Sequence, residues 1–235
     1  MVLTERGPML SGMNKRALLI VTSHAELGST GTKTGFWLEE LAAPYYELAD
    51  AGFDVTIASP LGGRPPADPK SESSDAAAVM RFLADPEATA QLASTRRLED
   101  VREPFDAYLV VGGHGVMWDL AESDVLARLL SRAWDDGRVV AAVCHGPAAF
   151  AKLGRIVTGR RVTGFSNEEE DAVGLTGVVP FALESKLKEL GGRYERGPTW
   201  GSFAVRDGQL ITGQNPASSR AVAKLVIEAA VSRPA

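Results

Sequence analysis

Short apolar runs alternate with amphipathic stretches along most of this chain. Runs without the polar alternation of a half-exposed strand cover residues 16–22, 53–58, 105–111 and 139–143. Apolar residues at helical spacing predict helices over about 34–51, 75–83, 86–94, 122–136, 147–153, 181–190 and 216–231, and shorter strands are expected near 161–163, 203–205 and 210–212. Strands buried on both faces and separated by helices are typical of parallel sheets. The pattern therefore predicts a three-layer α/β/α sandwich, flavodoxin-like, with a mostly parallel central sheet.

The pattern also suggests how the chain is divided. Residues 1–13 lack periodicity and are expected to form a flexible extension, whereas 14–235 form a single domain without a linker or a repeat. Residues 60–76 are rich in Gly, Pro and Ser and predict a long loop. Pro44 falls inside the first predicted helix and should kink it.

Composition and charge exclude several classes of protein. The 235 residues carry 30 acidic and 25 basic side chains, mixed along the chain, which does not fit a nucleic-acid-binding protein. No stretch approaches the roughly 20 apolar residues that a membrane span needs, and the first residues lack the apolar core of a signal peptide. One cysteine allows no internal disulfide. We therefore expect a cytoplasmic protein with no membrane or nucleic-acid partner.

That lone cysteine, Cys144, follows a buried strand and precedes His145, a Gly-Pro pair and a predicted helix. A sharp turn from strand to helix exposes a nucleophile, and the start of a helix should lower the pKa of the thiol. His145 is the nearest candidate base. The alternative is a small buried core cysteine, but such a residue would sit within the apolar run rather than at its end.

Three further segments offer weaker candidates. The glycines of 112–115 follow another predicted strand and allow backbone amides to approach a ligand closely, as an oxyanion hole requires. Glu39 and Glu40 lie early in the first predicted helix, where periodicity favours a solvated face. The acidic run 168–171 is typical of a solvated surface, although one of its carboxylates would be able to orient His145.

Motifs for metals and nucleotides are missing from the sequence. The three histidines, His24, His114 and His145, lack the spacing of known metal-ligand motifs. No Walker motif follows the first strand, and no G-x-G-x-x-G motif does so either. We expect neither a metal nor another cofactor.

Five segments together give a specific resemblance: Ala141–Pro147, Lys33–Glu40 with Pro44, Gly113–Gly115, Val162–Asn167 with the acidic run, and Leu210–Ser218. Over roughly residues 15–230 the chain resembles the ThiJ/PfpI superfamily, which is related to class I glutamine amidotransferases, and within it the heat-shock chaperone and glyoxalase III branch.

The resemblance implies roles for particular residues. Cys144 would be the nucleophile, His145 its base, Glu170 the acid that orients the histidine, and Glu40 the carboxylate that contacts the sulfur. Gly113 and His145 would supply the amides of the oxyanion hole. Glu168, Glu169 and Asp171 adjoin Glu170, so the orienting role stays open among these four positions. Trp37, His114 and Trp118 are expected to line the substrate pocket.

The implied reaction is the glutathione-independent conversion of methylglyoxal, a small 2-oxoaldehyde, to lactate by a glyoxalase III-type lyase (D-lactate dehydratase). We expect the protein to form a homodimer. Two other functions stay open. Cys144 would serve equally in a stress-response chaperone or oxidation sensor, because an accessible low-pKa thiol oxidises readily. The same side chains would also serve a cysteine amidohydrolase or peptidase.

Overall fold

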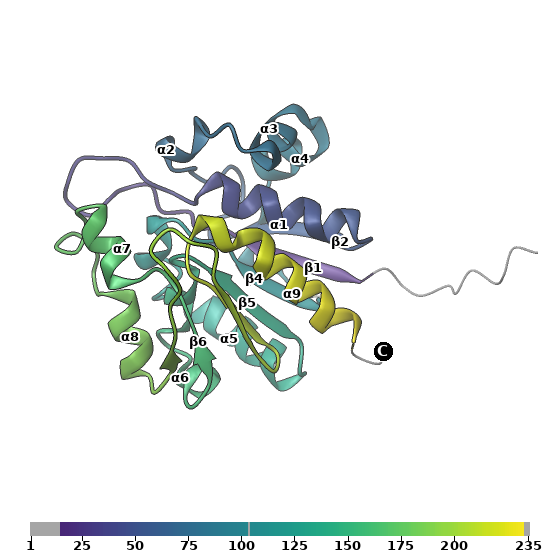
Figure 1. The fold of residues 1–235 in the computed structure, drawn as a ribbon. Helices are drawn as coiled ribbons and strands as arrows, with labels where there is room; N and C mark the ends of the chain where they lie inside the picture. Colours follow the sequence, from purple (N-terminus) through teal and green to yellow (C-terminus); the bar gives the residue numbers. More distant parts are fainter. Residues whose placement is uncertain (1–14, 103, 233–235) are drawn as a thin grey trace, which may run out of the picture.

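A computed structural model describes residues 15–102 and 104–232, so the extension predicted for 1–13 lies outside the described residues (Figure 1). A mostly parallel sheet forms the centre, with strand order β3-β2-β1-β4-β5-β9-β8. Its strands are β1 (Arg16–Ile20), β2 (Asp54–Ser59), β3 (Arg96–Arg97), β4 (Ala107–Val110), β5 (Val139–Val143), β8 (Ala204–Asp207) and β9 (Leu210–Gly213). Neighbouring strands are parallel except β8 and β9.

The inner strands are those that the apolar runs predicted. Every residue of β4 and β5 is buried, and Ala107 of β4 pairs with Val139 of β5 in parallel register. A strand covered on both faces has no place for polar side chains, which explains the unbroken apolar sequence. The carboxyl ends of β1, β4 and β5 consequently meet at one edge of the sheet.

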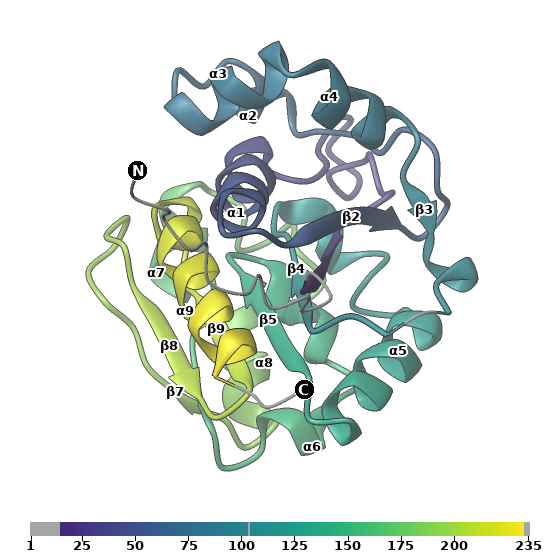
Figure 2. The same ribbon diagram turned by 90° about the vertical axis from the view of Figure 1, so that its right-hand side faces the viewer.

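Helices cover both faces of this sheet. Figure 2 shows α1 and α9 side by side on one face, with α5 on the other. The helices are α1 (Leu38–Asp50), α2 (Pro69–Glu72), α3 (Ala77–Ala84), α4 (Pro86–Ala93), α5 (Asp124–Asp135), α6 (Gly154–Val157), α7 (Asn167–Ala172), α8 (Leu183–Glu189) and α9 (Ser219–Val231). This arrangement confirms the predicted α/β/α sandwich. Within the described ranges, no helix combines the length and apolar character needed to cross a membrane.

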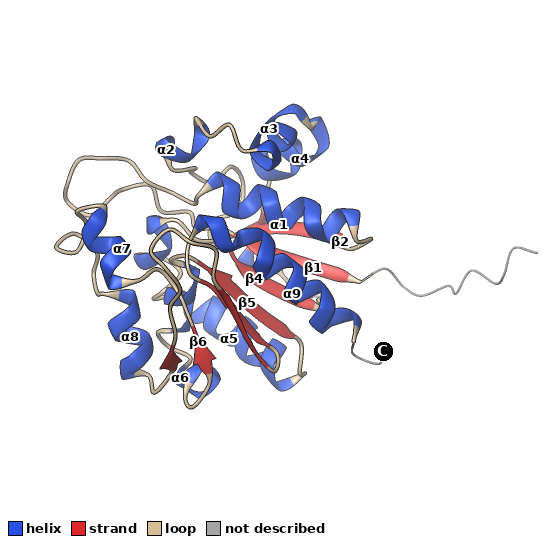
Figure 3. Ribbon diagram, in the orientation of Figure 1, coloured by secondary structure: helices blue, strands red, loops and turns tan. Residues whose placement is uncertain are grey.

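Several local elements differ from the expectation (Figure 3). The segment after Cys144 is a 3-10 helix, η3 (Gly146–Phe150), rather than an α-helix over 147–153. The loop predicted for 60–76 contains the short helix α2, which Asp68 caps. The acidic run forms α7, and β6 (Arg161–Val162) pairs with β7 (Arg193–Tyr194) in a separate small sheet. Further 3-10 turns are η1 (Leu98–Asp100), η2 (His114–Met117) and η4 (Pro216–Ser218).

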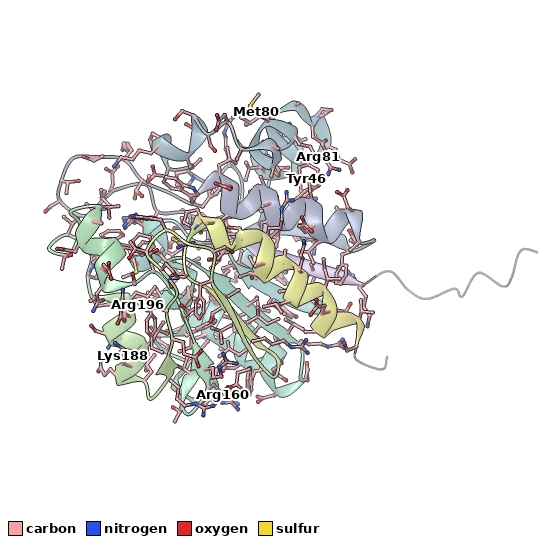
Figure 4. All side chains as sticks on the ribbon, in the orientation of Figure 1. Tyr46, Met80, Arg81, Arg160, Lys188 and Arg196 are labelled. Carbon is pink, nitrogen blue, oxygen red and sulfur yellow. The ribbon has the colours of Figure 1, made fainter. Side chains whose placement is uncertain are left out.

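The first helix is enclosed on more than one side. α1 runs through Pro44 to Asp50 and packs against β1, β2, α9 and α3. Arg81 of α3 places its guanidinium 3.7 Å from the ring centre of Tyr46, and both residues are labelled in Figure 4. Because α3 covers the side of α1 that would otherwise face solvent, most residues of α1 are buried.

Candidate active site

Cys144 occupies a sharp turn directly after β5. Its φ of 58° lies in the left-handed region, which is unfavourable for a side chain other than glycine. The turn is held because the Cys144 N–H donates to the Gly213 carbonyl at 2.9 Å and the Phe165 N–H donates to the Cys144 carbonyl at 2.9 Å. Gly146 fits here because a Cβ would collide with the Val110 carbonyl. The sharp turn expected from the sequence is therefore present, with a strained backbone at Cys144.

His145 connects the thiol to a carboxylate. Its Nδ1 lies 3.4 Å from Cys144 Sγ, and its Nε2 lies 2.7 Å from Glu170 Oε2. Because Glu170 is an anion, the hydrogen-bond network assigns the imidazole proton to Nε2. Nδ1 is then left as an acceptor that faces the sulfur. The adjacent side chains thus converge on this turn, and a Cys–His–Glu triad results.

A second imidazole binds the same carboxylate. His114 Nε2 lies 2.9 Å from Glu170 Oε1, so each carboxylate oxygen accepts a hydrogen bond from a different histidine. The two rings lie close together, with centroids 4.0 Å apart. His114 was predicted to line the substrate pocket. In the structure its Nε2 also contacts Glu170, the acid that orients His145.

Burial and hydrogen bonding set the charges of these groups. Burial alone would raise the pKa of Glu170, but the hydrogen bonds from His114 and His145 outweigh it and lower that pKa to about 2. Burial, together with the neighbouring His114, lowers the pKa of His145 to about 4 despite the Glu170 carboxylate. At neutral pH the acid is ionised and His145 is neutral, which suits a base.

Glu40 approaches the thiol from α1. It is fully buried, and neither carboxyl oxygen makes a hydrogen bond of ordinary geometry to the described part of the chain. Burial raises the pKa of Glu40 well above its usual value, while the Cys144 thiol and the Gly112 amide lower it in part. A Cβ at Gly112 would collide with Glu40 Oε2 and with the Val143 carbonyl. The solvated face that periodicity favoured for Glu40 is wrong.

The environment of Cys144 corrects one expectation about its charge. The sequence predicted a thiol pKa lowered by a following helix, but burial and the Glu40 carboxyl raise the pKa of the thiol well above its usual value. The side chain is only 4% exposed, and the turn after it is a short 3-10 helix. The resting site therefore holds a protonated thiol that needs a base to become a nucleophile.

Two backbone amides oppose that effect. The N–H groups of Gly113 and His145 donate towards the Cys144 sulfur and lower its pKa. Gly113 has a φ of 107°, and a Cβ there would collide with the Gly35 carbonyl and the Trp37 amide. Only glycine allows this close backbone approach. The pair predicted as the oxyanion hole therefore lies beside the sulfur.

The structure separates the four acidic residues that the sequence left open. Glu170 contacts His145, whereas Glu168 forms an ion pair with Arg196 at the surface, where Figure 4 labels Arg196. Asp171 is exposed. Glu169 is fully buried and belongs to another network: it accepts hydrogen bonds from Ser166, Trp200, Gln214 and Asn215.

The two aromatic residues predicted for the pocket lie at the same edge of the sheet. The Trp37 N–H donates to the Gly112 carbonyl at 3.0 Å. Trp118 stacks on His24 with ring centroids 5.2 Å apart. Residues 64–67 of the predicted loop line a pocket of about 550 Å³ beside α1 and α4, whose walls do not include Cys144.

One group of described residues has the composition of a metal site. The ligand atoms of His114, His145 and Glu170 all lie within 4.8 Å of one another. Both Glu170 oxygens already accept hydrogen bonds from these imidazoles, so a metal would have to replace those bonds. The three residues come from separate segments, which explains why sequence spacing gave no sign of the group.

Sequence reasoning missed two aromatic residues next to the triad. Phe165 packs on His145 with ring centroids 4.4 Å apart, and Trp200 meets Phe165 edge-on at 5.8 Å. Phe165 lies in the quoted segment Val162–Asn167, but no residue type or spacing there signals a ring stack. Trp200 lies far along the chain in an irregular segment, so only the folded structure brings it here.

Comparisons with known proteins agree with this geometry. The sequence model of the DJ-1/PfpI family matches residues 32–229. "Glutathione-independent glyoxalase HSP31" of Saccharomyces cerevisiae is 29% identical over 92% of this chain and 98% of its own length. "Glyoxalase 3" of Candida albicans is 29% identical over 91% of this chain and 98% of its own length.

Solved structures give the same result. The crystal structure of glyoxalase III from Candida albicans superposes with a TM-score of 0.83 at 28% identity, covering 92% of this chain and 97% of that one. The Francisella tularensis "Rapid Encystment Protein 24 KDa" superposes with a TM-score of 0.89 at 37% identity, covering 92% of this chain and 99% of that one.

Proposed function

Because this chain belongs to the DJ-1/PfpI family, we propose that it is a glutathione-independent glyoxalase that converts methylglyoxal to lactate. Relatives with this activity in their names are similar to it over nearly their whole length. The observation that carries the proposal is the Cys144–His145–Glu170 triad with a fourth group, the buried Glu40 carboxyl, beside the sulfur. A hydrolytic triad has no use for that fourth group, whereas a reaction that moves a proton between two carbons can use it as an additional acid and base.

The reaction begins with addition of the sulfur to the aldehyde carbon C1 of methylglyoxal, which forms a C–S bond. His145 Nδ1, 3.4 Å from Sγ, accepts the thiol proton as this bond forms, and Glu170 stabilises the imidazolium that results. The C1 oxygen becomes an oxyanion that the amides of Gly113 and His145 stabilise.

The second stage moves a proton from C1 to C2. Protonation of the oxyanion gives a hemithioacetal, and a base then removes the C1 hydrogen to form an enediol. Reprotonation at C2 leaves a hydroxyl on C2 and a thioester carbonyl on C1. C1 is oxidised and C2 is reduced by the same two electrons, so no external oxidant or reductant takes part.

Glu40 suits this transfer because its raised pKa makes it a stronger base than an ordinary carboxylate, and it lies beside the sulfur. Water then attacks the thioester, and the C–S bond breaks. Lactate leaves and the thiol is restored. The sum is methylglyoxal plus water to lactate.

The test is a glutathione-free assay that follows loss of methylglyoxal and formation of lactate. The wild-type protein should turn over without added metal or nicotinamide, and Cys144→Ala should be inactive. Turnover that needs glutathione, or that persists in Cys144→Ala, would contradict the proposal. A parallel assay with unfolded casein tests the peptidase alternative, because thiol-dependent cleavage of casein without lactate formation would favour hydrolysis.

A further inference from the structure

The loop that carries Trp200 contains unusual backbone strain. Among the non-glycine residues that the structure describes, Cys144 and Trp200 have a positive φ, 58° and 62°. The left-handed region is unfavourable for a bulky side chain, and strain of this kind is retained mainly at functional sites. Cys144 is already explained by its position as nucleophile, but Trp200 is not.

Hydrogen bonds from both sides fix this strained residue. The Trp200 N–H donates to Glu169 Oε1 at 2.9 Å, and Asn215 Nδ2 donates both to that oxygen and to the Gly201 carbonyl. Glu169 is fully buried and adjoins Glu170 on α7. The backbone of Trp200 is consequently held at a fixed position relative to the triad acid.

The indole extends from this anchor along a line of rings. Trp200 meets Phe165 edge-on at 5.8 Å, and Phe165 packs on His145 at 4.4 Å. Phe165 is buried, whereas Trp200 keeps 48% of its surface exposed. Burial in the core therefore does not explain the indole, whose free surface faces solvent one ring away from the catalytic imidazole.

We propose that Trp200 is a specificity-determining residue that contacts the substituent on the ketone carbon of the 2-oxoaldehyde. This inference rests on the proposed glyoxalase function. It adds which part of the substrate the Trp200 indole recognises. A flat, apolar substituent gains stacking and buried area against the indole, whereas hydrogen or methyl gains little. The site should therefore favour aryl over alkyl 2-oxoaldehydes by means of Trp200.

Two substitutions separate the ring from the backbone. Asparagine tolerates a positive φ, so Trp200→Asn removes the indole and leaves the loop conformation accessible. Trp200→Phe keeps an aromatic face. Leu61→Asn is a matched control, because Leu61 is 74% exposed and lies outside the ring cluster.

The experiment compares kcat/KM for phenylglyoxal with kcat/KM for methylglyoxal. The ratio should fall about three- to tenfold in Trp200→Asn, the range expected for loss of one aromatic contact, and should largely recover in Trp200→Phe. Leu61→Asn should leave it unchanged. A ratio in Trp200→Asn that stays within twofold of wild type, with a normal thermal midpoint, would overturn the proposal.

A second measurement does not depend on turnover. Phenacyl bromide and bromoacetone both alkylate Cys144, with formation of an S–C bond and loss of bromide, and intact mass gives the rates. Trp200→Asn should slow phenacyl bromide selectively. Absence of lactate formation in the wild type would contradict the proposed function alone, whereas equal alkylation ratios in wild type and Trp200→Asn would contradict the role of Trp200.

Discussion

Two buried carboxyl groups flank the Cys144–His145 pair, and their surroundings are opposite. Glu40 makes no hydrogen bond of ordinary geometry within the described chain, and burial raises its pKa well above the usual value. Glu170 accepts one hydrogen bond on each oxygen, and its pKa falls to about 2 although it too is buried. Burial alone therefore does not decide the charge: the two histidines outweigh it at Glu170, whereas the Cys144 thiol and the Gly112 amide offset it only in part at Glu40.

This contrast assigns different work to the same chemical group. A buried carboxyl whose pKa is raised above its usual value takes up a proton more readily, so Glu40 suits the transfer between carbons. A carboxylate that stays ionised orients a neighbour, so Glu170 suits holding the proton on His145 Nε2. Substitutions of Cys144, Glu170, Glu40 and His114 test this assignment.

Cys144→Ala removes the group that both carboxyls serve. Turnover of methylglyoxal should fall by about 10⁴-fold or more, because no other described side chain in the site is a comparable nucleophile. Lactate formation under single-turnover conditions measures the loss, and circular dichroism shows whether the fold is kept. Residual turnover within tenfold of wild type would place the nucleophile elsewhere.

Glu170→Gln tests the fixed anion. Glutamine is uncharged and offers one acceptor oxygen in place of two, so it cannot accept from both imidazoles, and the imidazolium of His145 loses its counter-charge. We expect kcat to fall about 10³-fold with KM little changed. Glu168→Gln is the matched control, because its carboxylate pairs with Arg196 at the surface. Equal losses in the two variants would show that the effect is not specific to the triad.

Glu40→Gln tests the proton carrier. Glutamine has nearly the same shape as glutamate but cannot carry a proton between C1 and C2. We therefore expect kcat to fall about 10²-fold. Glu39→Gln, one residue earlier on α1 and only partly buried, should change kcat less than twofold. Rapid alkylation of Cys144 that survives in Glu40→Gln would place the loss in the carbon-to-carbon transfer rather than in formation of the nucleophile.

The two carboxyls also predict opposite dependences of stability on pH. Folding lowers the pKa of Glu170 from 4.5 to about 2, so its contribution of about 3 kcal/mol is complete above pH 4.5 and is lost as the pH falls through 2. Folding raises the pKa of Glu40, so the contribution of this group to stability is present below pH 4.5 and is lost as the pH rises.

Urea unfolding of the two glutamine variants measures this contrast. Glu170→Gln should lose about 3 kcal/mol at pH 7, a factor of about 10² in the folding constant, and less near pH 3. In Glu40→Gln no carboxyl ionises at this position, so the free energy of unfolding should not fall for that reason as the pH rises from 4 to 7. A deficit in Glu170→Gln that does not change with pH would mean that the two imidazoles do not depress the carboxyl pKa.

The sequence predicts the strands that carry the site but not the different surroundings of Glu40 and Glu170. The central strands follow from continuous apolar runs, and Cys144 was recognised because it ends one of them. The two-residue strands β3 and β7 were missed because so few residues carry no periodicity. The helix expected after Cys144 is a 3-10 turn because the chain curves into α6 within a few residues.

Helical periodicity did not predict the burial of Glu40. Periodicity assumes that a helix has one covered face, but α1 packs on the sheet, on α9 and on α3. Glu169 and Glu170 pose a different difficulty, because their partners lie up to 56 residues away in sequence. Pairings between distant segments follow from the topology, so no local pattern distinguishes the two neighbours.

His114→Asn gives the smallest expected effect and tests whether both imidazoles matter to Glu170. One donor remains on the carboxylate, so kcat/KM at pH 7 should fall only about tenfold. Removal of His114 also removes an influence that lowers the pKa of His145 from its usual 6.5 to about 4. Activity requires neutral His145 and falls as the pH drops through that pKa, so the acid limb of kcat/KM should move to higher pH.

The groups that face His145 are Glu170, Glu169, His114 and the Cys144 thiol, with Glu40 across the sulfur. His114→Ala is the comparison variant, because it removes the same imidazole without leaving an amide near Glu170. Both variants should shift the limb in the same direction. A fall in kcat/KM with an unmoved limb would mean that His114 only fills space, and the low pKa of His145 would then come from burial alone.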